Sequence, residues 1–204
     1  MRLPSLKNAA LRGKRVLVRV DFNVLPLASH EPRIERALPT LHYLLKKGAE
    51  VILMTHLETN DGRTPSTKSL AKYLRKKLLP QGNITLLENL RKDPGEKKND
   101  ANFAKKLANL GDLYVNDAFS ASHRNHASLV SLPLLLPSYA GFLFEEEIKN
   151  LSRVFRPPRP FTLILGGGKV KTKLPLLKAL LPKADWVLLG GVIGNKFLKK
   201  KIIS

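Results

Sequence analysis

Short apolar runs alternate with amphipathic helical patterns along this chain, and this alternation restricts the possible folds more than any other feature of the sequence. Runs typical of buried strands occupy residues 15–22, 50–56, 83–89 and 112–118. Apolar residues at helical spacing lie between them, over 33–48, 67–79 and 99–111. Strands that alternate with helices of this length are typical of βαβ units. We therefore predict an α/β fold with a Rossmann-like parallel sheet and helices on both faces.

The pattern restarts in the last third of the chain. Residues 145–155 predict a helix, the stretch RPPRP ends it, and FTLILGGGK begins another strand–helix–strand unit that runs towards Ser204. We predict a first domain over 1–143, an interdomain helix and linker over 144–159, and the start of a second α/β domain over 160–204. A two-strand unit buries little core by itself, so we expect this second domain to be incomplete.

Composition and apolar patterning exclude several classes of protein and site. The chain has no cysteine, so it can form neither disulfides nor thiolate metal sites. No secretory signal is visible at the N-terminus, and the apolar stretch Leu129–Phe144 is interrupted by Pro133 and Pro137. We expect Leu132–Leu136 to be core, no membrane association, and a cytoplasmic location. Two histidines three residues apart, His123 and His126, are too few for a zinc site, and we predict no metal site.

The net charge of +20 favours an anionic partner but does not identify it. Most lysines fall at polar positions of the expected helices, where a solvated face is the ordinary explanation. Nucleic acid and phosphorylated metabolites therefore both stay open at this point.

Polar and charged residues follow each expected strand. Because the carboxyl ends of parallel strands meet at one edge of the sheet, where ligands bind in such folds, we expect these side chains to converge. Arginines gathered at one place need an anion between them, and their planar guanidinium suits phosphate and carboxylate oxygens. The residues are Asp21, Asn23, His56, Glu88, Asn89, Arg91, Asp117, His123, Arg124 and His126.

Seven stretches resemble, in order, signatures of the phosphoglycerate kinase family. They are VLVRVDFNV, PRIERALPTL, LLENLR, YVNDAFSASHRNHAS, PSYAGFLFEEEIKNL, LILGGGKVKTKLPLL and LLGGVIGNKFL, and together they span the chain. The resemblance implies a glycolytic kinase of two Rossmann-like domains that transfers a phosphoryl group between 1,3-bisphosphoglycerate and ADP, giving 3-phosphoglycerate and ATP. It also implies that this chain is the first domain, the connecting helix and the opening of the second domain.

The resemblance also implies a role for individual residues. The resemblance implies that the DFN motif, formed by Asp21, Phe22 and Asn23, binds the hydroxyl and carboxyl end of the glycerate. Arg33 contacts the acyl-phosphate end and acts in catalysis with Lys169, which stabilises the migrating phosphoryl group. His56, Arg91 and Arg124 hold the non-reacting phosphate, and Thr59 stands where the family has a further phosphate-binding arginine. Gly167, Gly168, Lys169 and Lys173 bind the nucleotide phosphates.

The sequence departs from the family pattern in two places. After His56, Glu58 and Thr59 replace a glycine and an arginine, and we hypothesise that Arg63 partly substitutes for that arginine. The later glycine-rich turn, the acidic ribose contact and the magnesium-binding aspartate have no counterpart in this chain.

The second departure bears on what this chain can do by itself. We expect Mg-ATP and Mg-ADP as substrates, with the magnesium ligand in the missing part. We therefore expect this chain to be a fragment of a kinase or one half of a split kinase, and a separate chain supplying the nucleotide domain is one possible partner. By itself it should bind the glycerate phosphate weakly and turn over negligibly. The alternative is a catalytically inactive basic module with the same fold that binds nucleic acid.

Overall fold

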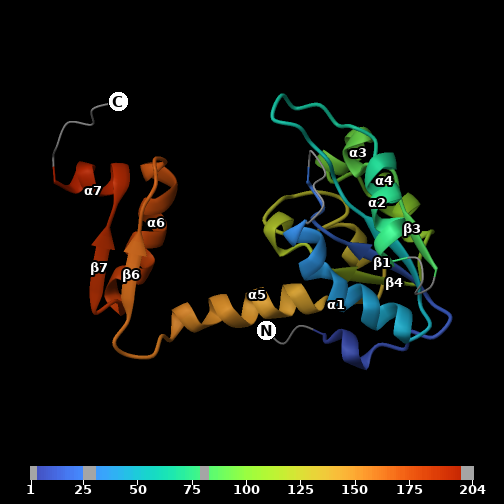
Figure 1. Cartoon of the computed structure of the whole chain (residues 1–204), viewed down its shortest axis with the longest axis horizontal. Helices are drawn as coiled ribbons and strands as arrows, with labels where there is room; N and C mark the ends of the chain where they lie inside the picture. The colour runs from blue at the N-terminus through green and yellow to red at the C-terminus, as the bar shows by residue number, and fades with distance from the viewer. Residues whose placement is uncertain (1–3, 25–30, 79–82, 199–204) are drawn as a thin grey trace. The chain divides into compact units, whose positions relative to one another are not determined.

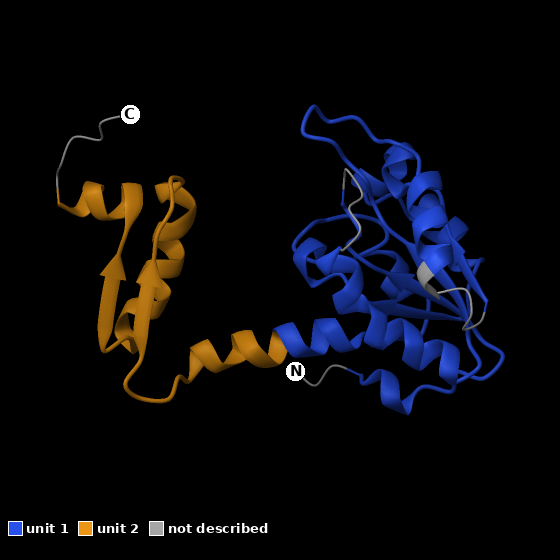
Figure 2. Ribbon diagram, in the orientation of Figure 1, with its two compact units in different colours: residues 1–147 blue, residues 148–204 orange. Residues whose placement is uncertain are grey.

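The computed structural model describes residues 4–24, 31–78 and 83–198. It divides into two compact units, Met1–Glu147 and Ile148–Ser204, and each is described here by itself (Figure 2).

Unit 1 contains a parallel sheet of five strands in the order β3-β2-β1-β4-β5 (Figure 1). The strands are β1 (Arg15–Arg19), β2 (Glu50–Met54), β3 (Ile84–Leu86), β4 (Leu113–Asn116) and β5 (Ser138–Ala140). Alternate residues of the central strand β1 face opposite sides of the sheet, and Leu17 and Val18 are both fully buried. Both faces are therefore covered, as expected for a parallel sheet. The predicted α/β fold is confirmed.

Helices cover the two faces of this sheet. They are α1 (Pro32–Lys46), α2 (Lys68–Leu78), α3 (Pro94–Lys97) and α4 (Ala101–Ala108), while α5 (Phe142–Ser152) continues into unit 2. Residues of α1 and α2, among them Leu41 and Leu70, pack with Val18 in one apolar cluster. On the other face, Leu107 of α4 packs with Leu17. The central strands thus end between two layers of helices.

The expectation that Leu132–Leu136 is core is wrong for part of the segment. Leu132 is fully buried, but Leu134 is 82% exposed and Leu135 is 44% exposed. The segment begins with a single 3-10 turn, Leu132–Leu134, which can direct only one of its faces inward. Within the three described stretches, none of the helices combines the length and apolar character needed to cross a membrane.

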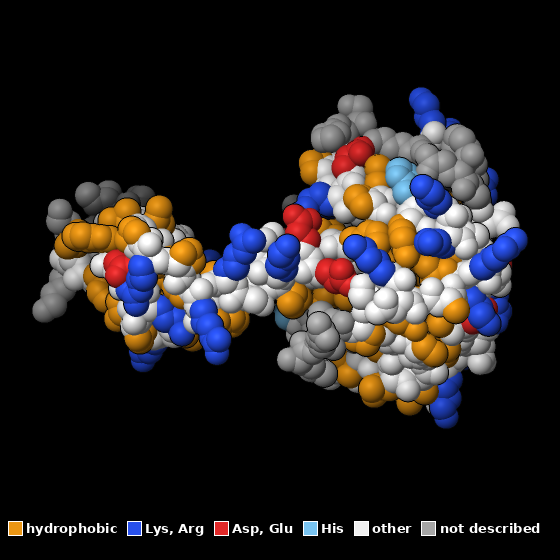
Figure 3. Space-filling view, turned by 90° about the horizontal axis from the view of Figure 1, so that it is seen from below, with side chains coloured by type: hydrophobic (Ala, Val, Ile, Leu, Met, Phe, Trp, Pro, Cys, Tyr) orange, Lys and Arg blue, Asp and Glu red, His pale blue; other side chains and the backbone are white. Residues whose placement is uncertain are grey.

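Unit 2 is a βαβ unit with a further helix. Strands β6 (Thr162–Leu165) and β7 (Trp186–Leu189) pair in parallel, and α6 (Val170–Leu180) connects them, followed by α7 (Gly191–Phe197). Its small core joins Leu163 and Leu165 to Leu177 and Ile193. The other face of the two strands is open, with Ile164 74% and Trp186 68% exposed. Figure 3 shows hydrophobic side chains of this unit at the molecular surface.

Candidate functional site

A cavity of about 380 Å³ opens at the carboxyl edge of the unit 1 sheet, lined in part by Asp21, Arg33, Asp117 and Ser120. Asp21 follows β1 and accepts a hydrogen bond from the Ser120 hydroxyl. The Arg33 guanidinium, in the first turn of α1, lies 3.5 Å from the Asp21 carboxylate and donates to the Asn23 carbonyl at 3.2 Å. Burial raises the pKa of Asp21, but the Ser120 hydrogen bond and several smaller contributions, among them the Arg33 charge and a hydrogen bond from the Asn23 N–H, together outweigh it and leave the pKa lowered. Asp21 is thus an ionised anchor for Arg33.

His56 lies at the end of β2 and is almost fully buried. Its Nδ1 lies 3.1 Å from a guanidinium nitrogen of Arg19. A guanidinium carries donors only, so Nδ1 accepts this hydrogen bond and Nε2 carries the proton. Burial, reinforced by the Arg19 charge, lowers the pKa of His56 to about 4. His56 is therefore a neutral side chain with one N–H to offer.

Arg19 is fully buried and belongs to a network that sequence reasoning missed. Its Nε donates to the Ser128 hydroxyl at 3.0 Å, and that hydroxyl donates to the buried Glu96 carboxylate at 2.6 Å. The Ser128 backbone N–H also donates to Glu96, and the Tyr114 hydroxyl donates to the Ser128 carbonyl. Burial lowers the pKa of Arg19, and the Glu96 charge opposes that shift. The network holds Arg19 in position to orient His56.

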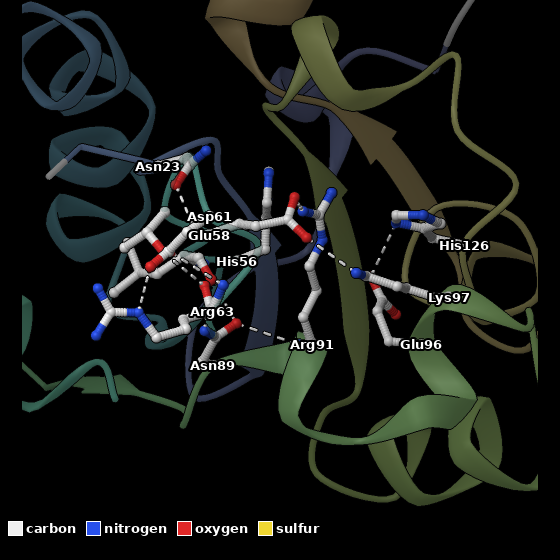
Figure 4. A network of polar contacts seen from close by, with 12 residues as sticks. Asn23, His56, Glu58, Asp61, Arg63, Asn89, Arg91, Glu96, Lys97 and His126 are labelled. Atoms are coloured by element: carbon white, nitrogen blue, oxygen red, sulfur yellow. Dashed lines mark hydrogen bonds and ion pairs between the residues drawn. The ribbon is translucent and has the colours of Figure 1, made fainter. Parts of the chain in front are cut away.

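Arg91 is already paired with a carboxylate. It follows β3, its side chain is 2% exposed, and its guanidinium contacts the Glu58 carboxylate. The other carboxylate oxygen of Glu58 lies 2.9 Å from the Lys97 ammonium (Figure 4). The Arg91 Nε is buried and has no hydrogen-bond partner among the described residues.

Thr59 and Arg63 lie in one tight turn of the loop after His56. The Thr59 N–H donates to the Arg63 carbonyl at 3.0 Å, and the Gly62 N–H donates to the Thr59 carbonyl. The Arg63 Nε donates to Asp61 at 2.7 Å, and the exposed guanidinium points away from Arg91 (Figure 4). The hypothesis that Arg63 replaces the family's arginine stays a prediction.

Arg124, His126 and His123 follow the fourth strand. Arg124 is half-buried, its Nε has no partner among the described residues, and its charge contributes to the lowered pKa of His56. His126 lies 3.8 Å from Glu96, and burial lowers its pKa. His123 is exposed. The part of the chain that the structure describes holds no cluster of three His, Asp or Glu side chains suited to a metal ion.

Glu88 and Asn89 organise the backbone around the site. Glu88 accepts hydrogen bonds from the backbone N–H groups of Thr67 and Asn89 at 2.8 and 2.7 Å. The Asn89 amide binds both the N–H and the carbonyl of Leu57, and the carbonyl of Pro65. These two residues therefore fix the loop that carries Glu58 and Thr59.

Asp117 ties the start of α5 to the end of β4. It accepts a hydrogen bond from the Phe144 N–H at 3.2 Å, and burial raises its pKa to about 6. Gly141 passes so close that a Cβ there would lie 2.2 Å from a carboxylate oxygen of Asp117. Glycine is required at this position because of that approach.

The structure thus brings the strand-end residues of unit 1 to one edge of the sheet, but not into one shared hollow. Asp21 and Arg33 line the cavity, whereas His56, Arg91 and Arg124 are not among its lining residues. The Phe22 side chain lies in the apolar core, and its N–H donates to the Thr55 hydroxyl at 3.0 Å. Arg19 could have been found from the sequence, since a charge inside the apolar run RVLVRV requires a buried partner. Ser120 and Lys97 carried no such signal.

The residues expected to bind nucleotide lie in unit 2, between β6 and α6. Gly167 has a φ of +122° and, like Gly168, has open space where a side chain would be. Lys169 is the residue before α6, and Lys173 is on its first turns. A glycine-rich turn at a helix N-terminus with adjacent lysines has the donors that phosphate needs.

Comparison with known proteins assigns this arrangement to a family. The family model for phosphoglycerate kinase matches residues 6–204. The chain belongs to the phosphoglycerate kinase family. The phosphoglycerate kinase of Coprothermobacter proteolyticus is 44% identical over 98% of this chain, and that of a Wolbachia species is 43% identical over 97%. These matches cover 58% and 56% of the two relatives.

Solved structures of phosphoglycerate kinases share the fold. The enzyme from Coxiella burnetii matches with a TM-score of 0.86 and 35% identity, and that from Pyrococcus horikoshii with 0.84 and 30%. Each match covers 97% of this chain and 57% of the solved chain. The chain therefore spans little more than half the length of the phosphoglycerate kinases it matches. The comparisons lend no support to the nucleic-acid-binding alternative.

Proposed function

We propose that this chain supplies the glycerate-phosphate site, and the opening of the nucleotide site, of a phosphoglycerate kinase. The complete enzyme transfers a phosphoryl group between 1,3-bisphosphoglycerate and ADP, giving 3-phosphoglycerate and ATP, in the cytoplasm. The observation that carries the proposal is the edge of the unit 1 sheet, which receives Arg33 from the first turn of α1, Arg91 from the turn after β3 and Arg124 from the segment after β4. Of these three arginines, Arg124 is close enough to His56 to lower its pKa. The family model covers all of these residues, since it matches residues 6–204.

In this proposal, the residues of unit 1 bind and orient the glycerate phosphate. Asp21 and Asn23 accept from the glycerate hydroxyl and hold Arg33, which neutralises the acyl-phosphate end. Arg124 and Arg91 bind the non-reacting phosphate. His56 is neutral, so it contributes one hydrogen bond rather than a charge.

Unit 2 contributes to the nucleotide end. The open Gly167–Gly168 turn accommodates phosphate oxygens close to the backbone, with Lys169 and Lys173 as charged donors. Lys169 is also proposed to stabilise the migrating phosphoryl group. Magnesium bound with the nucleotide would neutralise phosphate charge. We propose that its protein ligand lies in the part of the longer relatives that this chain does not cover. Phosphoryl transfer depends on positioning and charge neutralisation more than on a proton-transfer base, which agrees with this residue inventory.

The open face of β6 and β7 supports the need for a complementary segment. Large apolar side chains of Ile164 and Trp186 stand exposed there, and burying them stabilises by about 25 cal/mol per Å². We propose that the rest of a nucleotide-binding domain covers this face, either in the same polypeptide or as a separate chain.

Titration of the purified chain with 3-phosphoglycerate, measured by calorimetry, tests the proposal. Wild type should bind, and Arg33→Met should bind about tenfold more weakly, because one charge-assisted contact is lost. The matched control is Arg15→Met, which removes an arginine paired with Asp112 at the opposite end of β1. Equal affinity of all three chains, or no binding by any, would contradict the proposal.

A coupled assay with ATP tests the role of the missing part. We expect negligible turnover from this chain alone and recovery when the complementary nucleotide domain is added. Near-normal turnover of the 204-residue chain would refute that expectation.

A further inference from the structure

Two cations in the site share one internal anion. The Glu58 carboxylate contacts the Arg91 guanidinium with one oxygen and the Lys97 ammonium, at 2.9 Å, with the other. Figure 4 shows this carboxylate directed at both cations, with Lys97 reaching it from the far side. The two cations come from segments more than 30 residues beyond Glu58 in the chain.

The pair formed by Arg91 and Lys97 is suited to a phosphate. The Arg91 side chain is buried, and its Nε has no partner among the described residues, so the guanidinium still has donor capacity. A planar guanidinium beside an ammonium offers convergent donors to a tetrahedral anion. A carboxylate and a phosphate cannot occupy the same donors together. Glu58 therefore holds a position that an anionic ligand would need.

The Glu58 carboxylate is also kept close by its backbone. The Glu58 N–H donates to the Asn23 side-chain oxygen at 2.9 Å, and Asn89 fixes the preceding residue, Leu57. A group tethered in this way acts at a high effective concentration, so a free anion competes with it at a disadvantage.

We propose that Glu58 acts as a built-in competitor at this site: an external phosphate binds Arg91 and Lys97 only after it displaces the Glu58 carboxylate. That this phosphate is the phosphate group of 3-phosphoglycerate rests on the proposed function. The competition itself does not, because it concerns any phosphate that reaches Arg91.

Neutralising Glu58 has two linked consequences. It leaves the buried Arg91 charge without its anion, which lowers the stability of the chain in phosphate-free buffer. It also replaces a charged competitor for the donors by a weaker neutral acceptor, so phosphate binds more tightly and restores the lost stability by mass action.

The experiment compares wild type, Glu58→Gln and Asp112→Asn, with inorganic phosphate as the probe. Asp112→Asn is the control, since it changes the net charge equally but removes an ion pair with Arg15 at the other end of the sheet. Phosphate affinity is measured by calorimetry and the melting temperature by circular dichroism. We expect Glu58→Gln to bind phosphate about tenfold more tightly than wild type, and the control to stay within about twofold of wild type. Phosphate should raise the melting temperature of Glu58→Gln most.

Several outcomes would overturn the proposal. Equal or weaker phosphate binding by Glu58→Gln is one, and an equal gain in Asp112→Asn is another, because it would reduce the effect to net charge. If Glu58→Gln is unfolded without phosphate, added phosphate must restore its spectrum, and failure to do so also counts against the proposal.

A parallel titration with 3-phosphoglycerate separates the two claims. Tighter inorganic phosphate binding by Glu58→Gln without any 3-phosphoglycerate binding supports the role of Glu58 and refutes the proposed substrate. If wild type and Glu58→Gln have the same affinity for 3-phosphoglycerate, and also the same affinity for inorganic phosphate, the proposed substrate is supported and the role of Glu58 is refuted.

Discussion

Protonation of His56 should destabilise the folded chain, because the imidazole is buried and lies against the Arg19 guanidinium. The buried imidazole receives a hydrogen bond at Nδ1 from a guanidinium nitrogen 3.1 Å away. A proton placed on Nδ1 would remove that bond and set two positive groups against each other in a buried site. The pKa of His56 is accordingly lowered from 6.5 to about 4, first by burial and then by Arg19.

The sign and magnitude follow from linkage. Because the folded pKa of His56 lies below the unfolded value, the unfolded chain binds more protons between about pH 4 and pH 6.5. The stabilisation is therefore present above pH 6.5 and is lost as the pH falls towards and through 4. A shift from 6.5 to about 4 corresponds to about 3 kcal/mol of unfolding free energy.

The comparison that isolates this effect is wild type against His56→Asn. The asparagine oxygen can take the place of Nδ1 as an acceptor for Arg19, but it cannot be protonated. Urea unfolding followed by far-ultraviolet circular dichroism at neutral pH and at about pH 4 gives the two stabilities. The difference between the chains should change by about 3 kcal/mol across that range, with wild type losing more.

Trp186 provides an internal control for this assay. It is the only tryptophan in the sequence and lies in unit 2, so its fluorescence reports on a different unit from His56.

A stability difference between wild type and His56→Asn that does not vary with pH would refute the reasoning. So would a nuclear magnetic resonance titration in which His56 takes up its proton near 6.5.

Three further predictions concern Asp117, Gly141 and Asp100. The pKa of Asp117 is raised to about 6 by burial, so wild type should gain about 2 kcal/mol over Asp117→Asn as the pH falls from 6 to 3.8, measured by urea unfolding; a gain on raising the pH would contradict this. Gly141→Ala should lower the unfolding free energy by about 2 kcal/mol because the new Cβ meets Asp117, and the loss should shrink in the Asp117→Ala background; a loss of the same size in both backgrounds would show that Asp117 is not its cause. Asp100→Ala should cost about 1 kcal/mol in thermal unfolding, because Asp100 accepts from the Phe103 N–H at the start of α4, whereas Asp100→Asn should cost little; equal losses would argue against capping.

The sequence predicted the fold class because periodicity reports on burial. The runs at 15–22, 50–56 and 112–118 contain β1, β2 and β4, since strands buried on both faces are apolar throughout. The third apolar run, residues 83–89, contains β3, which is shorter than predicted. Strand β5 was missed because SYA is three residues long and its burial comes from pairing with β4, which no local pattern records.

The candidate site could be predicted only as far as the backbone determines it. That Asp21, His56 and Asp117 reach one edge follows from parallel strands. Which side chains pair across that edge does not follow, because the partners are brought together by tertiary packing. Glu58 and Arg91 are 33 residues apart in the sequence, and Arg19 and Ser128 are 109 residues apart. Neither spacing would reveal that the two side chains are in contact.

The chain of hydrogen bonds from Glu96 through Ser128 to Arg19 also constrains how this sequence can change over generations. A substitution at any one of the three removes a hydrogen bond from a buried charge or hydroxyl, so the effect of one substitution depends on which residues occupy the other two positions. Chimeras that exchange the segment containing α3 between family members should therefore lose stability where the two parents differ at residues 19, 96 or 128, and should regain it when all three come from one parent.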